Sequence, residues 1–191
     1  MNAVAEVVPA PLLKIDLGSG PNPLEGYEGA DSIKFDKVKH VLNIGKDRWP
    51  WPDSSVDEAY CSHVIEHLTN FNGQWERVHF FNELARVLKP DAGCMLIFPH
   101  WASSRYYGDP THKEPMSEWF HLYLMRDWRL QNAPHADIKH NPNGYDCNFQ
   151  TVIVNIHHQQ LGTRNADYQQ YACAWYKEAI LDLRCTVIKR A

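Results

Sequence analysis

The seven-residue segment SHVIEHL, residues 62–68, places two imidazoles and a carboxylate within five positions. On a continuous helix, His63 and His67 would lie at i and i+4 on one face and could share a zinc ion. Glu66 could then polarise a zinc-bound water, which is the chemistry of a zinc-dependent hydrolase. If the segment is instead the end of a buried strand, its polar groups would face a bound ligand. The surrounding elements decide between these interpretations.

Short apolar runs bounded by small or polar residues predict strands along most of the chain. Seven such runs are present, at residues 12–17, 27–33, 39–44, 55–65, 93–100, 149–161 and 180–190. Between the fourth and fifth runs, apolar residues recur at three- and four-residue steps from Trp75 to Leu88, which predicts an amphipathic helix. Residues 165–179 predict a second helix, opened by an Asn or Asp cap. Strands that alternate with helices favour a mostly parallel, doubly wound sheet.

The chain's length suits one well-buried domain, since it has 191 residues of which 44% are hydrophobic. We predict a loose N-terminal arm at residues 1–11 and a single domain at 12–191. Within that domain, residues 101–148 are irregular and rich in aromatics, His and Pro, and they form an expected insertion on the substrate side.

Charge and cysteine usage narrow the class of protein. The net charge of −4, with basic residues spread thinly, argues against duplex nucleic acid and acidic membrane surfaces as partners. The five cysteines are odd in number and form no C-x-x-C pair, which favours a reducing compartment and no structural zinc site. No leader pattern and no apolar run of about 20 residues is present, so we expect a cytoplasmic protein.

The candidate ligand-binding residues lie at or just after the carboxyl ends of the predicted strands, because ligands bind at the carboxyl ends of parallel strands. Glycines after the first strand would let the backbone approach a ligand closely. A carboxylate near the end of the second strand could accept hydrogen bonds from two ribose hydroxyls. In chain order the candidates are Asp16, Gly18, Gly20, Asp31, Asn43, Ser62 and His63.

In order and spacing, these motifs resemble those of class I S-adenosylmethionine-dependent methyltransferases. The matching stretches are IDLGSGPNP, GYEGADSI, WPWPDSSVDEAYCSHVIEHL and ELARVLKPDAGCMLIFP. The resemblance covers residues 12–100 and implies an α/β, doubly wound, Rossmann-like fold. Its sheet would have seven mostly parallel strands with an antiparallel C-terminal strand, and helices on both faces. It also implies S-adenosyl-L-methionine as the cofactor.

Carried over by residue, the resemblance implies a role for each candidate. Asp16, Gly18 and Gly20 would line the methionine and ribose side of the cofactor. Asp31 would take the ribose hydroxyls, and Asn43 would approach the adenine. Ser62 and His63 would close the site beneath the sulfonium. This interpretation makes residues 60–63 strand-like, so we predict no metal site.

The chain departs from the family pattern in its first connection. Asn22, preceded by Pro21, occupies the third glycine position of the first motif. Only ten residues separate Gly20 from Asp31, so we predict a loop or a single turn there instead of a full helix. Proteins that bind a nicotinamide cofactor have their acidic residue about 20 residues after the glycine motif, so the spacing here also argues against that cofactor.

The candidates for catalysis lie where the fifth strand ends and in the segment after it. His100 follows that strand, and Asp109 and His112 lie in a proline-containing turn. With His63, these residues are our candidates for a general base, which assists when the acceptor is a hydroxyl or a protonated amine. The aromatic residues Trp101, Tyr106, Tyr107 and Trp119 would form a wall over the acceptor or, alternatively, core beneath the insertion. An Asp109–His112 hydrogen bond with a purely structural role is the alternative for His112.

The leading hypothesis is an enzyme that methylates oxygen or nitrogen of a small-molecule acceptor. The alternatives are a non-catalytic S-adenosylmethionine-binding partner or regulatory module and, less favoured, a zinc-dependent hydrolase. The sequence NPNGY, residues 141–145, departs from the Asn-Pro-Pro-Tyr signature of nucleic-acid amino-methylating enzymes and predicts a turn. Nucleic acid is therefore a disfavoured partner, and the sequence leaves the oligomeric state open.

Overall fold

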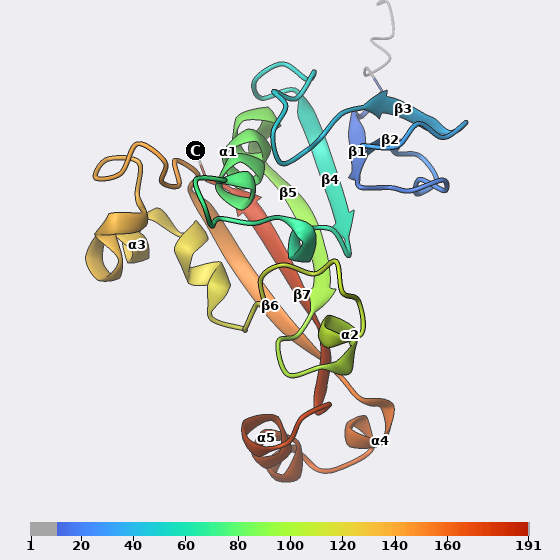
Figure 1. Cartoon of the computed structure of the whole chain (residues 1–191), viewed down its shortest axis with the longest axis vertical. Coiled ribbons are helices and arrows are strands. Elements are labelled where there is room, and N and C mark those ends of the chain that lie inside the picture. Colours follow the sequence, from blue (N-terminus) through green and yellow to red (C-terminus); the bar gives the residue numbers. More distant parts are fainter. Residues whose placement is uncertain (1–10, 191) are drawn as a thin grey trace, which may run out of the picture.

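A computed structural model describes residues 11–190 of the chain, and its framework is one seven-stranded sheet (Figure 1). The strand order is β3-β2-β1-β4-β5-β7-β6. Strand β7 runs antiparallel to both of its neighbours, and the pairs from β3 to β5 are parallel. The strands are β1 (Lys14–Leu17), β2 (Glu28–Asp31), β3 (Val38–Val41), β4 (Val56–Ser62), β5 (Leu88–Pro99), β6 (Phe149–His157) and β7 (Ile180–Lys189). The predicted α/β class, the seven strands and the antiparallel C-terminal strand are confirmed.

Both predicted helices are present. Helix α1 (Glu76–Val87) buries its apolar stripe, and α5 (Ala166–Trp175) is capped by the Asn165 side chain, which accepts a hydrogen bond from the Tyr168 amide. The remaining helices are short: α2 (Ser104–Tyr107), α3 (Arg126–Asn132) and α4 (Gln159–Gly162), with 3₁₀ turns η1 (Ile65–His67), η2 (Phe120–Leu124) and η3 (Pro134–Ala136). None of the helices between residues 11 and 190 has the length and hydropathy needed to cross a membrane.

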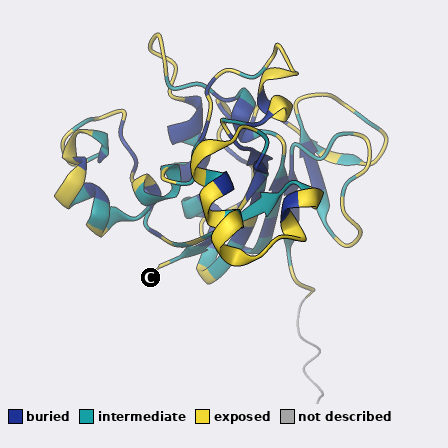
Figure 2. Cartoon of the chain, turned by 90° about the horizontal axis from the view of Figure 1, so that it is seen from below, coloured by how far each residue is buried: buried dark blue, intermediate teal, exposed yellow. Residues whose placement is uncertain are grey.

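The sheet's two faces differ in how they are covered. One face, carrying Ile15, Cys61 and Leu96, packs with α1 into the main core, which appears as the dark blue centre of Figure 2. On the other face, Met95, Val152 and Val154 are exposed. The connections from β1 to β4 contain no helix in the described chain, so the expected cover of both faces by helices is incomplete.

A braced loop replaces a helix in the first connection, as the short spacing predicted. The Leu24 amide donates to Asp16 Oδ2 and the Gly20 amide donates to Asp31 Oδ2, each at 2.9 Å. The Gly18 amide donates to the Ala30 carbonyl oxygen at 2.7 Å. These bonds tie the loop to the carboxyl ends of β1 and β2, where the predicted site lies.

The predicted insertion at residues 101–148 packs through short helices and a buried ion pair. Arg129 and Asp137 are both fully buried, and their side chains lie 2.8 Å apart. The NPNGY stretch forms the predicted turn, in which the Gly144 amide donates to the Asn141 carbonyl oxygen at 2.8 Å. Of the predicted N-terminal arm, residues 1–10 lie outside the described residues.

Candidate functional site

A cavity of about 490 Å³ lies at the carboxyl ends of β1, β2 and β4. Gly18, Asp31, Asn43 and His63 line it, so the fold brings together four residues predicted at strand ends. The predicted residues Asp16, Gly20 and Ser62 are not among its lining residues. Residues that the sequence did not single out complete the wall: Ser32, Ile33, Leu42, Ile44, Val64, Leu68, Glu76 and Lys113, together with His67.

Gly18 lies close to Val64, in the segment after β4. Its φ is +71°, which L side chains rarely adopt, and a Cβ placed there would lie 2.2 Å from Val64 Cγ2. Gly20 also has a positive φ, +56°, but a Cβ there would meet no atom within 4 Å. Gly18 therefore requires glycine for both its conformation and the lack of space, whereas Gly20 requires it for its conformation alone.

We expect Gly18→Ala to lower the free energy of unfolding by about 1–3 kcal/mol, through left-handed strain and overpacking against Val64. Displacement of Val64 would also distort the cavity and weaken S-adenosylhomocysteine binding by about tenfold or more. Urea unfolding and calorimetry measure both effects. The control is Gly26→Ala, where φ is +82° and space is open, so only the strain applies. Equal binding by both variants would contradict the steric argument.

The two predicted aspartates have different surroundings. Asp31 accepts from the Gly20 amide through Oδ2 and from the Ile33 amide, at 2.8 Å, through Oδ1. An ionised carboxylate has about four lone-pair sites, so Asp31 retains acceptor capacity toward the cavity. Asp16 is buried, and this burial raises the pKa of its carboxyl. Its bond to the Leu24 amide makes it a brace for the loop.

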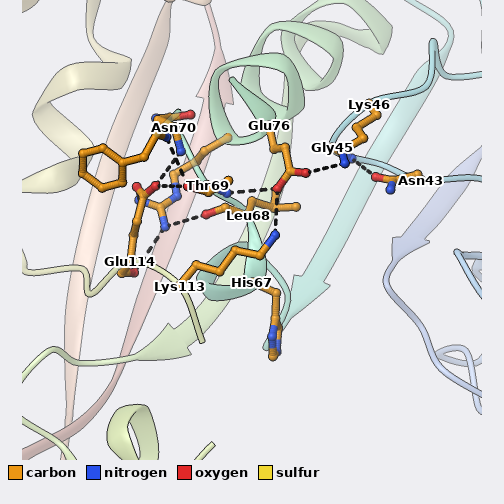
Figure 3. Close-up of polar contacts among 12 residues, drawn as sticks. Asn43, Gly45, Lys46, His67, Leu68, Thr69, Asn70, Glu76, Lys113 and Glu114 are labelled. Atoms are coloured by element: carbon orange, nitrogen blue, oxygen red, sulfur yellow. Dashed lines mark hydrogen bonds and ion pairs between the residues drawn. The ribbon is translucent and has the colours of Figure 1, made fainter. Parts of the chain in front are cut away.

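A network of charged side chains around Glu76 forms another part of the cavity wall (Figure 3). Glu76, at the start of α1, is buried and contacts Lys46 Nζ at 3.0 Å and Lys113 Nζ at 3.1 Å. Lys113 belongs to residues 101–148, the predicted insertion, so this contact attaches that segment to the cavity wall. Next to it, the Asn43 side-chain oxygen accepts from the Gly45 amide at 3.1 Å.

The segment SHVIEHL is the end of a strand followed by one turn. Strand β4 ends at Ser62, His63 has a φ of +55°, and η1 spans only Ile65–His67. His63 and His67 therefore do not share the face of a continuous helix, which confirms the strand interpretation. His63 lines the cavity with its side chain 48% exposed, and its Nδ1 lies 3.3 Å from Glu66 Oε1. The Glu66 carboxylate raises the pKa of His63.

His112 lies behind the cavity wall, close to His67 and Glu66. Its Nδ1 is 2.7 Å from the Tyr106 carbonyl oxygen, and the two imidazole centroids of His67 and His112 are 4.7 Å apart. Asp109 Oδ2 is 3.8 Å from His112 Nε2, which is too long for the hydrogen bond considered as an alternative. Asp109 Oδ1 instead accepts from the Thr111 amide and hydroxyl.

His100 is not among the residues that line the 490 Å³ cavity with His63. Its buried ring has Nε2 3.1 Å from Glu118 Oε2, and it lines a second hollow of about 600 Å³ with Trp101 and Trp119. Of the four aromatics considered for a wall, only Tyr106 is buried. The other three are exposed: Trp101, Tyr107 and Trp119. They do not form a wall around the cavity at the ends of β1, β2 and β4.

Comparisons with known proteins agree with this architecture. Residues 30–96 match the family described as the methyltransferase domain. No curated protein matches the chain. Among solved structures, a S-adenosylmethionine-dependent methyltransferase from Archaeoglobus fulgidus has a TM-score of 0.61 at 17% identity, over 94% of this chain and 87% of the other.

Two further structures were solved with S-adenosylhomocysteine. The 1,6-didemethyltoxoflavin-N1-methyltransferase of Burkholderia thailandensis has a TM-score of 0.54 at 10% identity, covering 95% of this chain and 72% of its own. The geranyl diphosphate C-methyltransferase of Streptomyces coelicolor A3(2) has a TM-score of 0.51 at 12% identity, covering 93% and 72%. At these identities the likeness shows the fold. The fold and the matched segment together support the predicted class, the class I S-adenosylmethionine-dependent methyltransferases.

Proposed function

We propose that the protein binds S-adenosylmethionine in the 490 Å³ cavity and transfers its methyl group to oxygen or nitrogen of a small-molecule acceptor. The observation that carries this proposal is the convergence of Gly18, Asp31 and His63 from three strand ends on one cavity. The solved methyltransferases that act on 1,6-didemethyltoxoflavin and geranyl diphosphate share the fold, which supports a small-molecule acceptor.

The lining residues fit the proposed cofactor. The cavity volume falls within the range of about 300–1,000 Å³ that is usual for ligand pockets. Asp31 offers carboxylate oxygens for ribose hydroxyls, and the buried Leu42 and Ile44 offer apolar surface for a flat base. The missing side chain at Gly18 leaves the backbone accessible. When bound, S-adenosylmethionine supplies an activated methyl group on a sulfonium.

In this proposal His63 is the general base, since it lines the cavity and keeps half of its side chain accessible. Glu66 beside it favours the imidazolium that would form after proton transfer. Lys113 and Glu76 form part of the cavity wall. The cavity must also hold the acceptor at near-attack distance from the methyl group, and this positioning by itself accounts for a large share of the catalysis of methyl transfer.

We expect Asp31→Ala to raise the dissociation constant for S-adenosylhomocysteine by about 10- to 150-fold. Loss of hydrogen bonds to a charged acceptor costs about 1.5–3 kcal/mol, which gives this range. Calorimetry measures it directly. Asp36→Ala is the matched control, because Asp36 is an exposed aspartate in the loop between β2 and β3. Unchanged affinity in a folded Asp31→Ala would contradict the cofactor assignment.

The acceptor can be sought by incubating the protein with a metabolite extract and methyl-labelled S-adenosylmethionine. Transfer of label to a small molecule is the expected result. Cofactor binding without transfer to any extract fraction would favour the non-catalytic binding module. We place the protein in a reducing, cytoplasmic compartment, a proposal supported by its five free cysteines, four of them buried.

A further inference from the structure

We propose that Glu66, His67 and His112 form a binding site for a divalent metal ion of the zinc type, next to the cofactor cavity. The ligand atoms of these three residues all lie within 4.8 Å of one another. The residues come from two segments, the turn after β4 and the insertion, so their convergence is a product of the fold. The set differs from the helical pair His63 and His67 that the sequence pattern suggested.

Glu66 is the strongest indication of a missing cation. Glu66 is 0% exposed, and neither of its carboxylate oxygens has a hydrogen-bond partner among residues 11–190. A buried carboxylate without partners is costly, and such charges are normally paired or bound to metals. The nearest cationic candidates are imidazoles, at 3.3 Å for His63 Nδ1 and 3.9 Å for His112 Nε2 from Oε1. A bound metal ion would satisfy this carboxylate.

The His112 ring is oriented as a metal ligand. Its Nδ1 lies 2.7 Å from the Tyr106 carbonyl oxygen, which can only accept, so Nδ1 carries the proton. This tautomer leaves the lone pair on Nε2, the atom that faces Glu66. Metal-binding histidines characteristically donate their other ring N–H to a carbonyl or carboxylate in this way. The ring is buried, so its orientation is fixed before any ion binds.

His67 links this cluster to the cavity. It points away from the Glu76–Lys113 network, as Figure 3 shows, and it is both a lining residue and the third member of the cluster. Its Nδ1 is 3.1 Å from the Thr111 hydroxyl oxygen, a contact that would hold the ring in place. Zinc bonds of about 2.0–2.2 Å would draw the three ligand atoms closer by modest side-chain rotations.

A site with three protein ligands leaves a coordination position open, as in catalytic zinc sites. Because His67 lines the cavity, this position would lie toward the bound acceptor. The mixed imidazole and carboxylate set suits zinc and neighbouring transition metals better than magnesium or calcium. If the proposed methyl transfer holds, the ion would bind an acceptor bearing an oxygen or nitrogen donor and lower the pKa of that donor.

The test is titration of chelator-treated protein with Co²⁺, followed by visible absorption, and displacement of Co²⁺ by Zn²⁺. We expect one ion per chain in the wild type. Removing a ligand should weaken affinity by at least the 10- to 100-fold that is typical for losing a supporting residue. Glu66→Gln and His112→Ala are the variants, and His140→Asn, an exposed histidine elsewhere, is the control expected to bind normally. Absence of stoichiometric binding, or wild-type affinity in both variants, overturns the proposal.

Thermal unfolding separates metal binding from misfolding. In chelator, Glu66→Gln should melt no lower than the wild type, because it removes an unpartnered buried charge. Zn²⁺ at 100 times the wild-type dissociation constant should raise the wild-type melting temperature by about 5–10 °C, and a 10- to 100-fold weaker Glu66→Gln by only about 1–5 °C. An equal rise in both proteins contradicts the site. S-adenosylhomocysteine binding is measured separately, so failure of the cofactor proposal would leave this result intact.

Discussion

His63→Asn is expected to lower the rate of methyl transfer by about 10²–10⁴-fold, the usual contribution of a general base. S-adenosylhomocysteine affinity should stay within about threefold of the wild type. Asparagine is the suitable replacement because His63 has a φ of +55°, a region in which Asn is enriched. It keeps a polar side chain of similar reach and removes the basic imidazole. Single-turnover transfer to the identified acceptor measures the effect.

The control for this variant is His140→Asn, which makes the same change at an exposed position outside the cavity. It should transfer methyl groups at the wild-type rate. An unchanged rate in His63→Asn at saturating acceptor would show that positioning alone drives the reaction. A parallel loss of thermal stability and cofactor affinity would instead assign His63 to the structure of the turn after β4.

Local sequence patterns predicted the elements of the fold well, because their signals are local. The apolar steps between Trp75 and Leu88 predicted α1, and the Asn165 cap marked α5. The boundaries were less accurate at β5, which begins at Leu88 instead of Gly93. There the chain passes from helix to strand through Lys-Pro, and the β4–β5 register shifts between Val56 and Glu58.

The site residues at the carboxyl ends of strands could be predicted from the sequence. Asp31 ends β2, and the other three lining residues, Gly18, Asn43 and His63, follow strands by one or two positions, so parallel pairing brings them together. His100 follows β5 by the same rule, yet its ring turns to Glu118. The backbone there pairs with Met116 in an isolated parallel bridge, and His100 is not among the residues that line the cavity.

Contacts between the cavity and the insertion could not be predicted. Lys113 reaches Glu76 across 37 positions, and its amide donates to the Glu66 carbonyl oxygen at 2.9 Å. No spacing rule links residues at such separations. The grouping of Glu66 with His112 depends on the same path of the chain. Glu66 and His67 in SHVIEHL could be recognised in the sequence as possible metal ligands. Their partner His112 lies in a segment without regular secondary structure, so the sequence did not indicate that it joins them.

Residues 101–148 contain the buried ion pair of Arg129 and Asp137. We expect Asp137→Ala to lower the free energy of unfolding by about 3–5 kcal/mol. Removing one partner of a buried ion pair leaves the other charge uncompensated, which gives this magnitude. Arg129 would keep its bonds to the Tyr123 and Cys147 carbonyl oxygens and lose its fully buried carboxylate partner. Urea unfolding, analysed at constant m-value, measures the change.

Asp146→Ala is the matched control, since this carboxylate is 63% exposed and lies 3.9 Å from Arg126. Its loss should cost no more than about 1 kcal/mol. Asp137→Asn should be intermediate, because its single side-chain oxygen can still accept from either the Lys139 amide or Arg129, but not from both, and it carries no charge. A loss below about 1 kcal/mol in Asp137→Ala would mean that the ion pair does not determine the path of residues 101–148. Helix packing around η2 and β6 would then have to hold the insertion against the sheet.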